Sequence, residues 1–161
     1  MASGVWLDSK TGYIRFTGFT QNCVADVKNA MIKLKENNVQ QIILDLRGNP
    51  GGLLTEAVEI VSLFVPQGSE IVSTKGKVKQ FDEEFKTTKE AVDDKIPLAV
   101  IINRGSASAS EIVAGAIQDL DRGIIIGQRT FGKGLVQTTR PLSYNSQLKV
   151  TTAKYYIPSG R

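Results

Sequence analysis

The chain has 161 residues, of which 41% are hydrophobic and 22% charged, and its net charge is +4. These values fit one globular domain with an ordinary core, and they exclude disordered and fibrous classes. The lysines are scattered and opposed by nearby acids, which argues against a nucleic-acid-binding surface. No apolar run reaches the roughly 20 residues that span a bilayer, and the N-terminus lacks a signal-peptide layout. The single cysteine, Cys23, and the absence of histidine argue against a zinc site.

The first half of the chain predicts alternating strands and helices. Residues 12–19 alternate like a strand, and Asn22 is expected to cap a helix that ends at Asn37. The apolar run 41–46 is typical of a strand buried on both faces. A turn rich in glycine and proline then leads into a helix predicted over residues 54–64.

The second half continues the pattern with short strands. We expect two strands within 70–85, strands over 98–102, 124–126, 135–139 and 147–157, a helix over 108–120 and a charged loop over 86–95. The strands 98–102 and 124–126 are expected to be buried. Repeated units of strand, glycine turn and helix predict an α/β layered fold with a mainly parallel inner sheet.

A turn of small residues, 103–111, precedes the predicted helix 108–120. It carries three serines, Ser106, Ser108 and Ser110, near a helix N-terminus that favours negative charge. A serine hydroxyl needs a neighbouring base to act as a nucleophile, and without histidine a Ser-His-Asp arrangement cannot be built within the chain. Ser108 to Glu111 also fits a capping box, which requires no catalytic role. The spacing leaves all three serines open as nucleophiles.

A glycine-flanked lysine, Lys133, is the candidate base. A lysine with the reference pKa of about 10.4 is neutral in about one molecule in 2,500 at pH 7, so a lysine base needs a dry pocket. If the chain is extended from Lys133, Gln137 points to the same face and can orient the amine. The alternative for Lys133 is a solvated surface lysine, and the alternative for Gln137 is an ordinary polar residue of a strand.

The lysine turn has a second interpretation. Residues 127–133 show the G-x4-G-K spacing of a phosphate-binding loop after a short strand. However, Gly134 stands where that motif requires Ser or Thr for magnesium, and the residues after it look extended instead of helical. The pattern therefore favours a phosphate site less than a lysine base.

A third segment, residues 45–52, ends a predicted buried strand with a Pro-Gly-Gly turn. The backbone N–H groups of Gly51 and Gly52 are candidate donors to an oxyanion, together with the N–H of Ala109, which follows Ser108. The alternative is a tight turn that simply joins strand to helix.

Taken in order and spacing, residues 44–52, 105–111 and 127–137 closely resemble the carboxyl-terminal processing proteases, also called tail-specific proteases. The similarity runs from Gly12 to the end of the chain. It implies a Clp protease/crotonase-like α/β core and a serine endopeptidase with a Ser–Lys dyad that cleaves proteins near their C-termini. Carried over by motif, the site residues are Ser108 as nucleophile, Lys133 as base, Gln137 as support for the lysine, and the amides of Gly51, Gly52 and Ala109 as oxyanion hole.

The resemblance implies further properties. Glu111 and Asp119 fall on positions linked to function in some relatives. Family members carry a PDZ domain before a core that continues past the position of Arg161. We therefore expect residues 1–161 to be one protease core without its PDZ domain, with residues 1–3 as an expression remnant. No metal or cofactor is expected, the expected partners are protein or peptide substrates, and the expected compartment is extracytoplasmic, periplasmic or cell-envelope. The alternative function is a non-catalytic, protease-like binding or scaffold domain.

Overall fold

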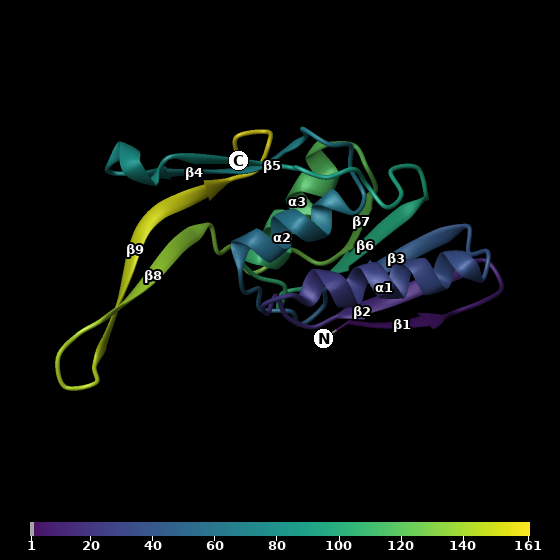
Figure 1. The fold of residues 1–161 in the computed structure, drawn as a ribbon, viewed down its shortest axis with the longest axis horizontal. Coiled ribbons are helices and arrows are strands. Elements are labelled where there is room, and N and C mark those ends of the chain that lie inside the picture. Colours follow the sequence, from purple (N-terminus) through teal and green to yellow (C-terminus); the bar gives the residue numbers. More distant parts are fainter. Residues whose placement is uncertain (1) are drawn as a thin grey trace.

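A computed structural model describes residues 2–161 and places their strands in two sheets (Figure 1). The larger sheet has the strand order β1-β2-β3-β6-β7. Its strands are β1 (Ala2–Trp6), β2 (Thr11–Phe16), β3 (Gln41–Asp45), β6 (Leu98–Ile102) and β7 (Ile124–Gly127). Strands β2, β3, β6 and β7 run parallel, whereas β1 pairs with β2 in the antiparallel direction. The predicted α/β fold with a mainly parallel inner sheet is confirmed.

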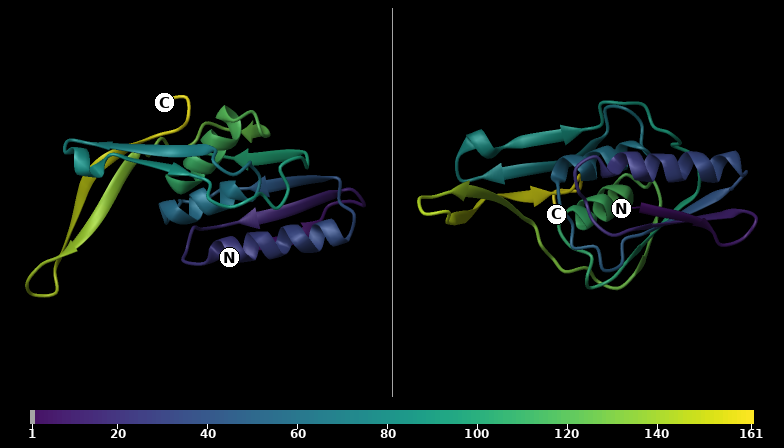
Figure 2. Two further views of the ribbon diagram at one scale, coloured as in Figure 1. Left: turned by 45° about the horizontal axis from the view of Figure 1, so that its top comes forward. Right: turned by 60° about the horizontal axis from the view of Figure 1, so that its bottom comes forward.

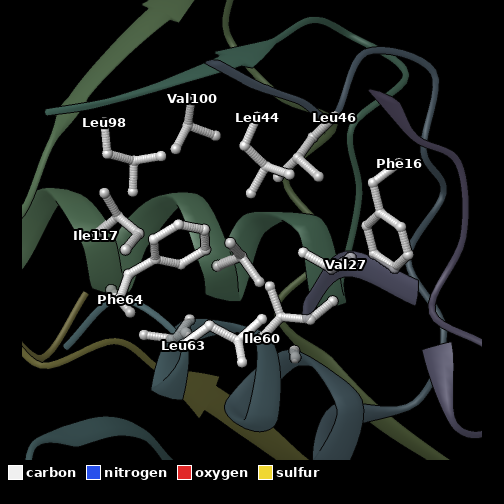
Figure 3. Packing of buried hydrophobic residues seen from close by; sticks show 14 of the residues in the cluster. Phe16, Val27, Leu44, Leu46, Ile60, Leu63, Phe64, Leu98, Val100 and Ile117 are labelled. Carbon is white, nitrogen blue, oxygen red and sulfur yellow. The ribbon is translucent and has the colours of Figure 1, made fainter. Parts of the chain in front are cut away.

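The described part of the chain has three α-helices, α1 (Cys23–Glu36), α2 (Leu54–Ser62) and α3 (Ala109–Asp119). Helix α1 packs on β1 and β2 and helix α3 packs on β7, whereas α2 packs on α1 and α3. Apolar side chains of the strands, such as Leu44 and Val100, point toward Phe64 and Ile117 on the helical side, and all four are buried (Figure 3). This shared core fixes where β3 and β6 end, and therefore where the turns that follow them lie.

The smaller sheet is antiparallel and has the order β5-β4-β9-β8. Its strands are β4 (Glu70–Gly76), β5 (Glu83–Lys86), β8 (Leu135–Pro141) and β9 (Gln147–Tyr156), with a short 3-10 helix, η1 (Lys79–Phe81), between β4 and β5. The β8–β9 hairpin projects from the body as a long arm (Figures 1 and 2). The other end of β9 returns to the body and brings the end of the chain close to α3.

Residues 2 and 3 belong to β1, and their origin as an expression remnant stays a prediction. Two local features differ from the sequence expectations. Strand β7 was predicted to be buried, but Ile124 is 62% exposed because β7 forms an edge of its sheet. Asn22 stands at the N-cap of α1 with φ 64° and no side-chain cap bond. The carboxylate of Glu56 instead accepts the N–H groups of Asn22 and Val24, at 2.8 and 3.1 Å.

An ion pair between buried Asp45 and exposed Arg47 closes the end of β3. Arg47 Nη2 lies 2.7 Å from Asp45 Oδ2, and the hydroxyl of Tyr13 donates to the same oxygen. Burial works to raise the pKa of Asp45, but these bonds outweigh it and hold that pKa at about 2.

No helix in residues 2–161 is long and apolar enough to cross a membrane.

Candidate active site

The serine turn joins β6 to α3, and Ser108 occupies the N-cap position of that helix. Its backbone has φ 55° and ψ −114°, a combination that non-glycine residues rarely adopt. Such a conformation costs about 1–3 kcal/mol and persists where surrounding contacts hold it, commonly at functional sites. The turn therefore fixes Ser108 in a strained position at the positive end of α3.

The three serines of this turn have different surroundings. Ser106 Oγ donates to the carbonyl of Leu46 at 2.8 Å, and Ser110 Oγ donates to the carbonyl of Asn49 at 2.9 Å. Both serines are completely buried. Their hydroxyls tie the serine turn to the turn after β3. Ser108 differs from both because its side chain faces a cleft.

The cleft has a volume of about 400 Å³ and is lined by both Ser108 and Lys133. Much of its remaining wall is apolar, contributed by Ile102, Ile112, Ile125 and Ile157. Within residues 2–161, no hydrogen bond joins Ser108 Oγ to Lys133 Nζ. The structure therefore brings the predicted nucleophile and base to one cleft, with the lysine amine not engaged on the serine.

Tyr155 is a residue of this cleft that the sequence did not reveal. It lines the cleft together with Ser108, and its backbone N–H donates to Gly134 O at 2.9 Å. Burial raises the pKa of Tyr155, and the nearby Ser108 hydroxyl works in the opposite direction. No motif marks this residue, because it reaches the site through the return of β9 to the body.

Glu111 connects the serine turn to the lysine turn. Its carboxylate accepts the N–H groups of Ser108 at 2.7 Å, Gly132 at 2.6 Å and Lys133 at 2.8 Å. The first bond belongs to the capping box of α3, as the sequence predicts. The other two attach the lysine turn to the start of the same helix. One carboxylate thus sets the distance between the backbones of Ser108 and Lys133.

The Pro-Gly-Gly turn packs directly on the serine turn. Gly51 has φ 97°, and a Cβ on it would lie 2.6 Å from the Ala107 carbonyl oxygen and 2.9 Å from the Ala109 nitrogen. The N–H of Gly51 donates to Asn49 Oδ1 at 2.9 Å. In the described part of the chain, the N–H groups of Gly52 and Ala109 have no acceptor. Of the three predicted oxyanion donors, Gly51 is therefore bonded within its own turn, and the roles of Gly52 and Ala109 stay predictions.

The structure does not bring Gln137 to the cleft wall. Gln137 lies in β8, where its Nε2 is 3.4 Å from Thr151 Oγ1 and its side chain is exposed. Strand β8 starts at Leu135, and a register shift separates Val136 from Gln137. The simple alternation expected from Lys133 is therefore interrupted, and the role of Gln137 stays a prediction.

Asp119 lies at the far end of α3, about 16 Å along the helix axis from Ser108 at 1.5 Å per residue. Its carboxylate accepts the N–H of Ser159 and a guanidinium N–H of Arg161, each at 2.9 Å. Burial works to raise the pKa of Asp119, but these bonds outweigh it and lower that pKa. In this geometry Asp119 holds the turn after β9 against α3, and that turn carries Ile157 into the cleft.

Other chemistries find less support in the geometry. Gly134 leads into strand β8, so the helix that a phosphate-binding loop requires after its lysine is not formed. Among residues 2–161, no group of three His, Cys, Asp or Glu side chains is placed to hold a metal ion. Cys23 is buried, and its thiol donates to Glu56 Oε2 at 3.2 Å.

Comparison with known proteins identifies the family. Residues 10–161 match the family model described as Peptidase family S41. The chain belongs to peptidase family S41. It is 44% identical over 158 residues to the carboxy-terminal-processing protease of Bartonella bacilliformis, covering 96% of this chain and 36% of that protein. It is 43% identical over 147 residues to the carboxyl-terminal-processing protease of Synechocystis sp., covering 91% of this chain and 34% of that protein.

A solved S41 relative shares the fold. The photosystem II D1 C-terminal processing protease superposes with a TM-score of 0.83 at 39% identity, over 93% of this chain and 38% of that one. This confirms the predicted resemblance to the carboxyl-terminal processing proteases and the α/β core it implies. The chain spans about a third of the length of the curated S41 relatives it matches.

Proposed function

We propose that this chain is the catalytic core of a serine peptidase that cleaves proteins near their C-termini, with Ser108 as nucleophile and Lys133 as general base. The observation that carries the proposal is the position of Ser108. Its strained N-cap conformation directs its hydroxyl into a cleft shared with Lys133, while Ser106 and Ser110 are occupied with backbone carbonyls. Membership of family S41 supports a peptidase of this type.

In the proposed reaction, neutral Lys133 takes the proton of Ser108 as Oγ attacks a peptide carbonyl. The resulting oxyanion is held by the backbone N–H groups of Gly52 and Ala109, because both lack acceptors. The protonated lysine then gives its proton to the leaving amine. Water hydrolyses the acyl-enzyme with the same lysine as base.

The lysine must approach the serine before it can act. Within residues 2–161, Ser108 Oγ forms no hydrogen bond with Lys133 Nζ, although both side chains line the same cleft. Catalytic hydrogen bonds are often long before substrate binds and tighten in the substrate complex. A peptide that fills the apolar part of the cleft would exclude water from the space between the lysine amine and Ser108.

The substrates are proposed to be proteins with extended C-terminal segments, and the compartment to be extracytoplasmic. The substrate class extends what the matched relatives' names say, since those proteins are C-terminal processing proteases. The compartment is the one that the family resemblance implies. Gln137 is proposed to support the lysine once the cleft is occupied.

The proposal is tested by turnover of an unfolded protein substrate, with cleavage sites mapped by mass spectrometry. We expect cleavage near the substrate C-terminus that is lost in Ser108→Ala and in Lys133→Ala. Lys149→Ala is the matched control, because Lys149 is an exposed lysine on the β8–β9 arm, and it should cleave like the parent. Equal cleavage by the parent and both site variants would exclude the dyad. Tight peptide binding without any cleavage would favour the scaffold function.

A further inference from the structure

Asn49 is completely buried, and its side chain joins two segments of the core. Its Nδ2 donates to the carbonyl of Phe16 at 2.9 Å, at the end of β2. Its Oδ1 accepts the N–H of Gly51 at 2.9 Å. Both polar ends of the amide are therefore engaged, and the Gly51 N–H is turned toward Asn49 and away from other acceptors.

The backbone carbonyl of Asn49 contacts the serine turn on both sides of the nucleophile. It accepts the N–H of Ala107 at 3.0 Å, immediately before Ser108, and the hydroxyl of Ser110 at 2.9 Å, two residues after it. One buried residue is thus bonded to the Pro-Gly-Gly turn through its side chain and to the serine turn through its main chain.

The two candidate oxyanion donors lie on these same two turns. Gly52 follows Gly51 directly, and Ala109 lies between the two serine-turn contacts of Asn49. Donors stabilise an oxyanion when they are fixed in place before charge develops, and a displacement near 1 Å can lower the rate about 100-fold.

We infer that Asn49 is a positioning residue that holds the N–H groups of Gly52 and Ala109 at the separation an oxyanion requires. This inference rests on the proposed peptidase function and adds a residue that acts through the backbone, without touching substrate. Its amide fixes the Pro50–Gly51 peptide unit. The next unit, which carries the Gly52 N–H, is held through the Gly51 carbonyl, which accepts the N–H of Phe19 at 3.1 Å, while the Asn49 side chain anchors the carbonyl of Phe16 in the same region.

The first test compares Asn49→Ala with Thr87→Ala. Each variant leaves a buried backbone group without its partner, so both should lower Tm. Thr87 is buried and bonds to Pro66 and Ser69, away from both turns of the site, so its variant should keep kcat within about 2-fold of the parent. Asn49→Ala should lower kcat about 10- to 100-fold with KM changed less than 3-fold. Equal loss of kcat in the two variants would overturn the inference.

A transition-state mimic gives a readout that does not depend on turnover. A peptidyl boronic acid bonds to the serine oxygen and places a boron-bound oxygen in the hole, so its Ki should rise in Asn49→Ala by the same factor as kcat falls. The Kd of an uncleaved peptide, measured in the Ser108→Ala background, should stay unchanged. If the parent is active and the boronate Ki of Asn49→Ala equals that of the parent, the role of Asn49 is contradicted and the proposed peptidase function is not. A parent that neither cleaves peptides nor binds the boronate would overturn the proposed function and this inference together.

If Asn49→Ala does not fold, the isosteric Asn49→Asp decides the question. A protonated carboxyl at this position can donate to Phe16 O and accept from Gly51 as the amide does, whereas a carboxylate cannot donate. The ratio of Asn49→Asp to parent activity should therefore rise as pH falls. A ratio that is independent of pH would overturn the inference.

Discussion

Replacing Glu111 with alanine removes the acceptor of three backbone N–H groups at once. These groups belong to Ser108, Gly132 and Lys133, and their bonds to the carboxylate are 2.6–2.8 Å long. The change leaves the cap of α3 unsatisfied and releases the lysine turn from the helix. We expect a large loss of activity with a smaller loss of stability.

The size of the expected loss in kcat/KM follows from how exposed the three N–H groups are. A hydrogen bond to a charged group contributes about 1.5–3 kcal/mol, and the upper value applies where the donor is buried, as at Ser108. Gly132 is exposed and Lys133 half-buried, so water can replace much of what Glu111 supplies there. A total near 3 kcal/mol expressed in the transition state corresponds to about a 100-fold fall in kcat/KM. The loss in free energy of unfolding should stay near the 1–2 kcal/mol of a lost N-cap.

The assay is kcat/KM on a labelled peptide together with urea unfolding, measured for Glu111→Ala and Glu111→Gln. The glutamine variant keeps one acceptor oxygen, so its kcat/KM should lie between those of the parent and the alanine variant. A Glu111→Ala enzyme with parent-like kcat/KM would refute the reasoning that this carboxylate places the lysine turn. A loss of activity no larger than expected from the unfolded fraction would refute it as well.

Three further predictions concern residues that hold the turns of the site in place. Ser106→Ala should lose about 1–3 kcal/mol in urea unfolding, because a buried carbonyl loses its donor, and a parent-like stability would contradict that bond. Asp45→Asn should be less stable than the parent by about 2 kcal/mol at pH 7. Because the folded-state pKa of Asp45 is depressed to about 2, the difference should be complete above about pH 5, shrink as pH falls through 2 and vanish near pH 1. A pH-independent difference would exclude linkage through Asp45. Gly51→Ala should abolish activity, because the added Cβ would lie 2.6 Å from the Ala107 carbonyl oxygen. Gly48 also has a positive φ but no neighbouring atom where a Cβ would lie, so Gly48→Ala should lower stability and leave activity unchanged. Equal activities of the two variants would show that the close approach of Gly51 to the serine turn is not needed.

The parallel core could be predicted because each buried strand is a continuous apolar run that is visible in the sequence. The apolar run ending at Asp45 and the run Leu98–Ile102 each identify a strand, and the glycine turn and serine turn that follow them are visible in the sequence. Parallel strands bring their carboxyl ends to one edge, so two of the site's turns could be placed together. Strand β7 was misjudged because an apolar run does not reveal that the strand is an edge.

The remaining features depend on contacts between distant segments. Ser106, Ser108 and Ser110 look alike in the sequence, and the structure separates them by the carbonyl that each hydroxyl does or does not meet. Tyr155 lies near Ser108 because β9 returns to α3, and no sequence pattern near residue 155 predicts the direction that β9 takes. The role of Asn49 likewise depends on Phe16, 33 residues away. Tertiary structure supplies these pairs, which no local pattern encodes.

The central claim is that Lys133 removes the proton from Ser108. It is tested most directly by the rate at which an active-site-directed fluorophosphonate labels the enzyme, with the labelled residue mapped by mass spectrometry. Lys133→Arg keeps the positive charge but supplies no neutral amine, and a general base is worth about 10²–10⁴ in rate. The account predicts labelling at Ser108 in the parent and labelling at least about 100-fold slower in Lys133→Arg. Labelling at another residue, or equal rates in the two enzymes, would contradict it.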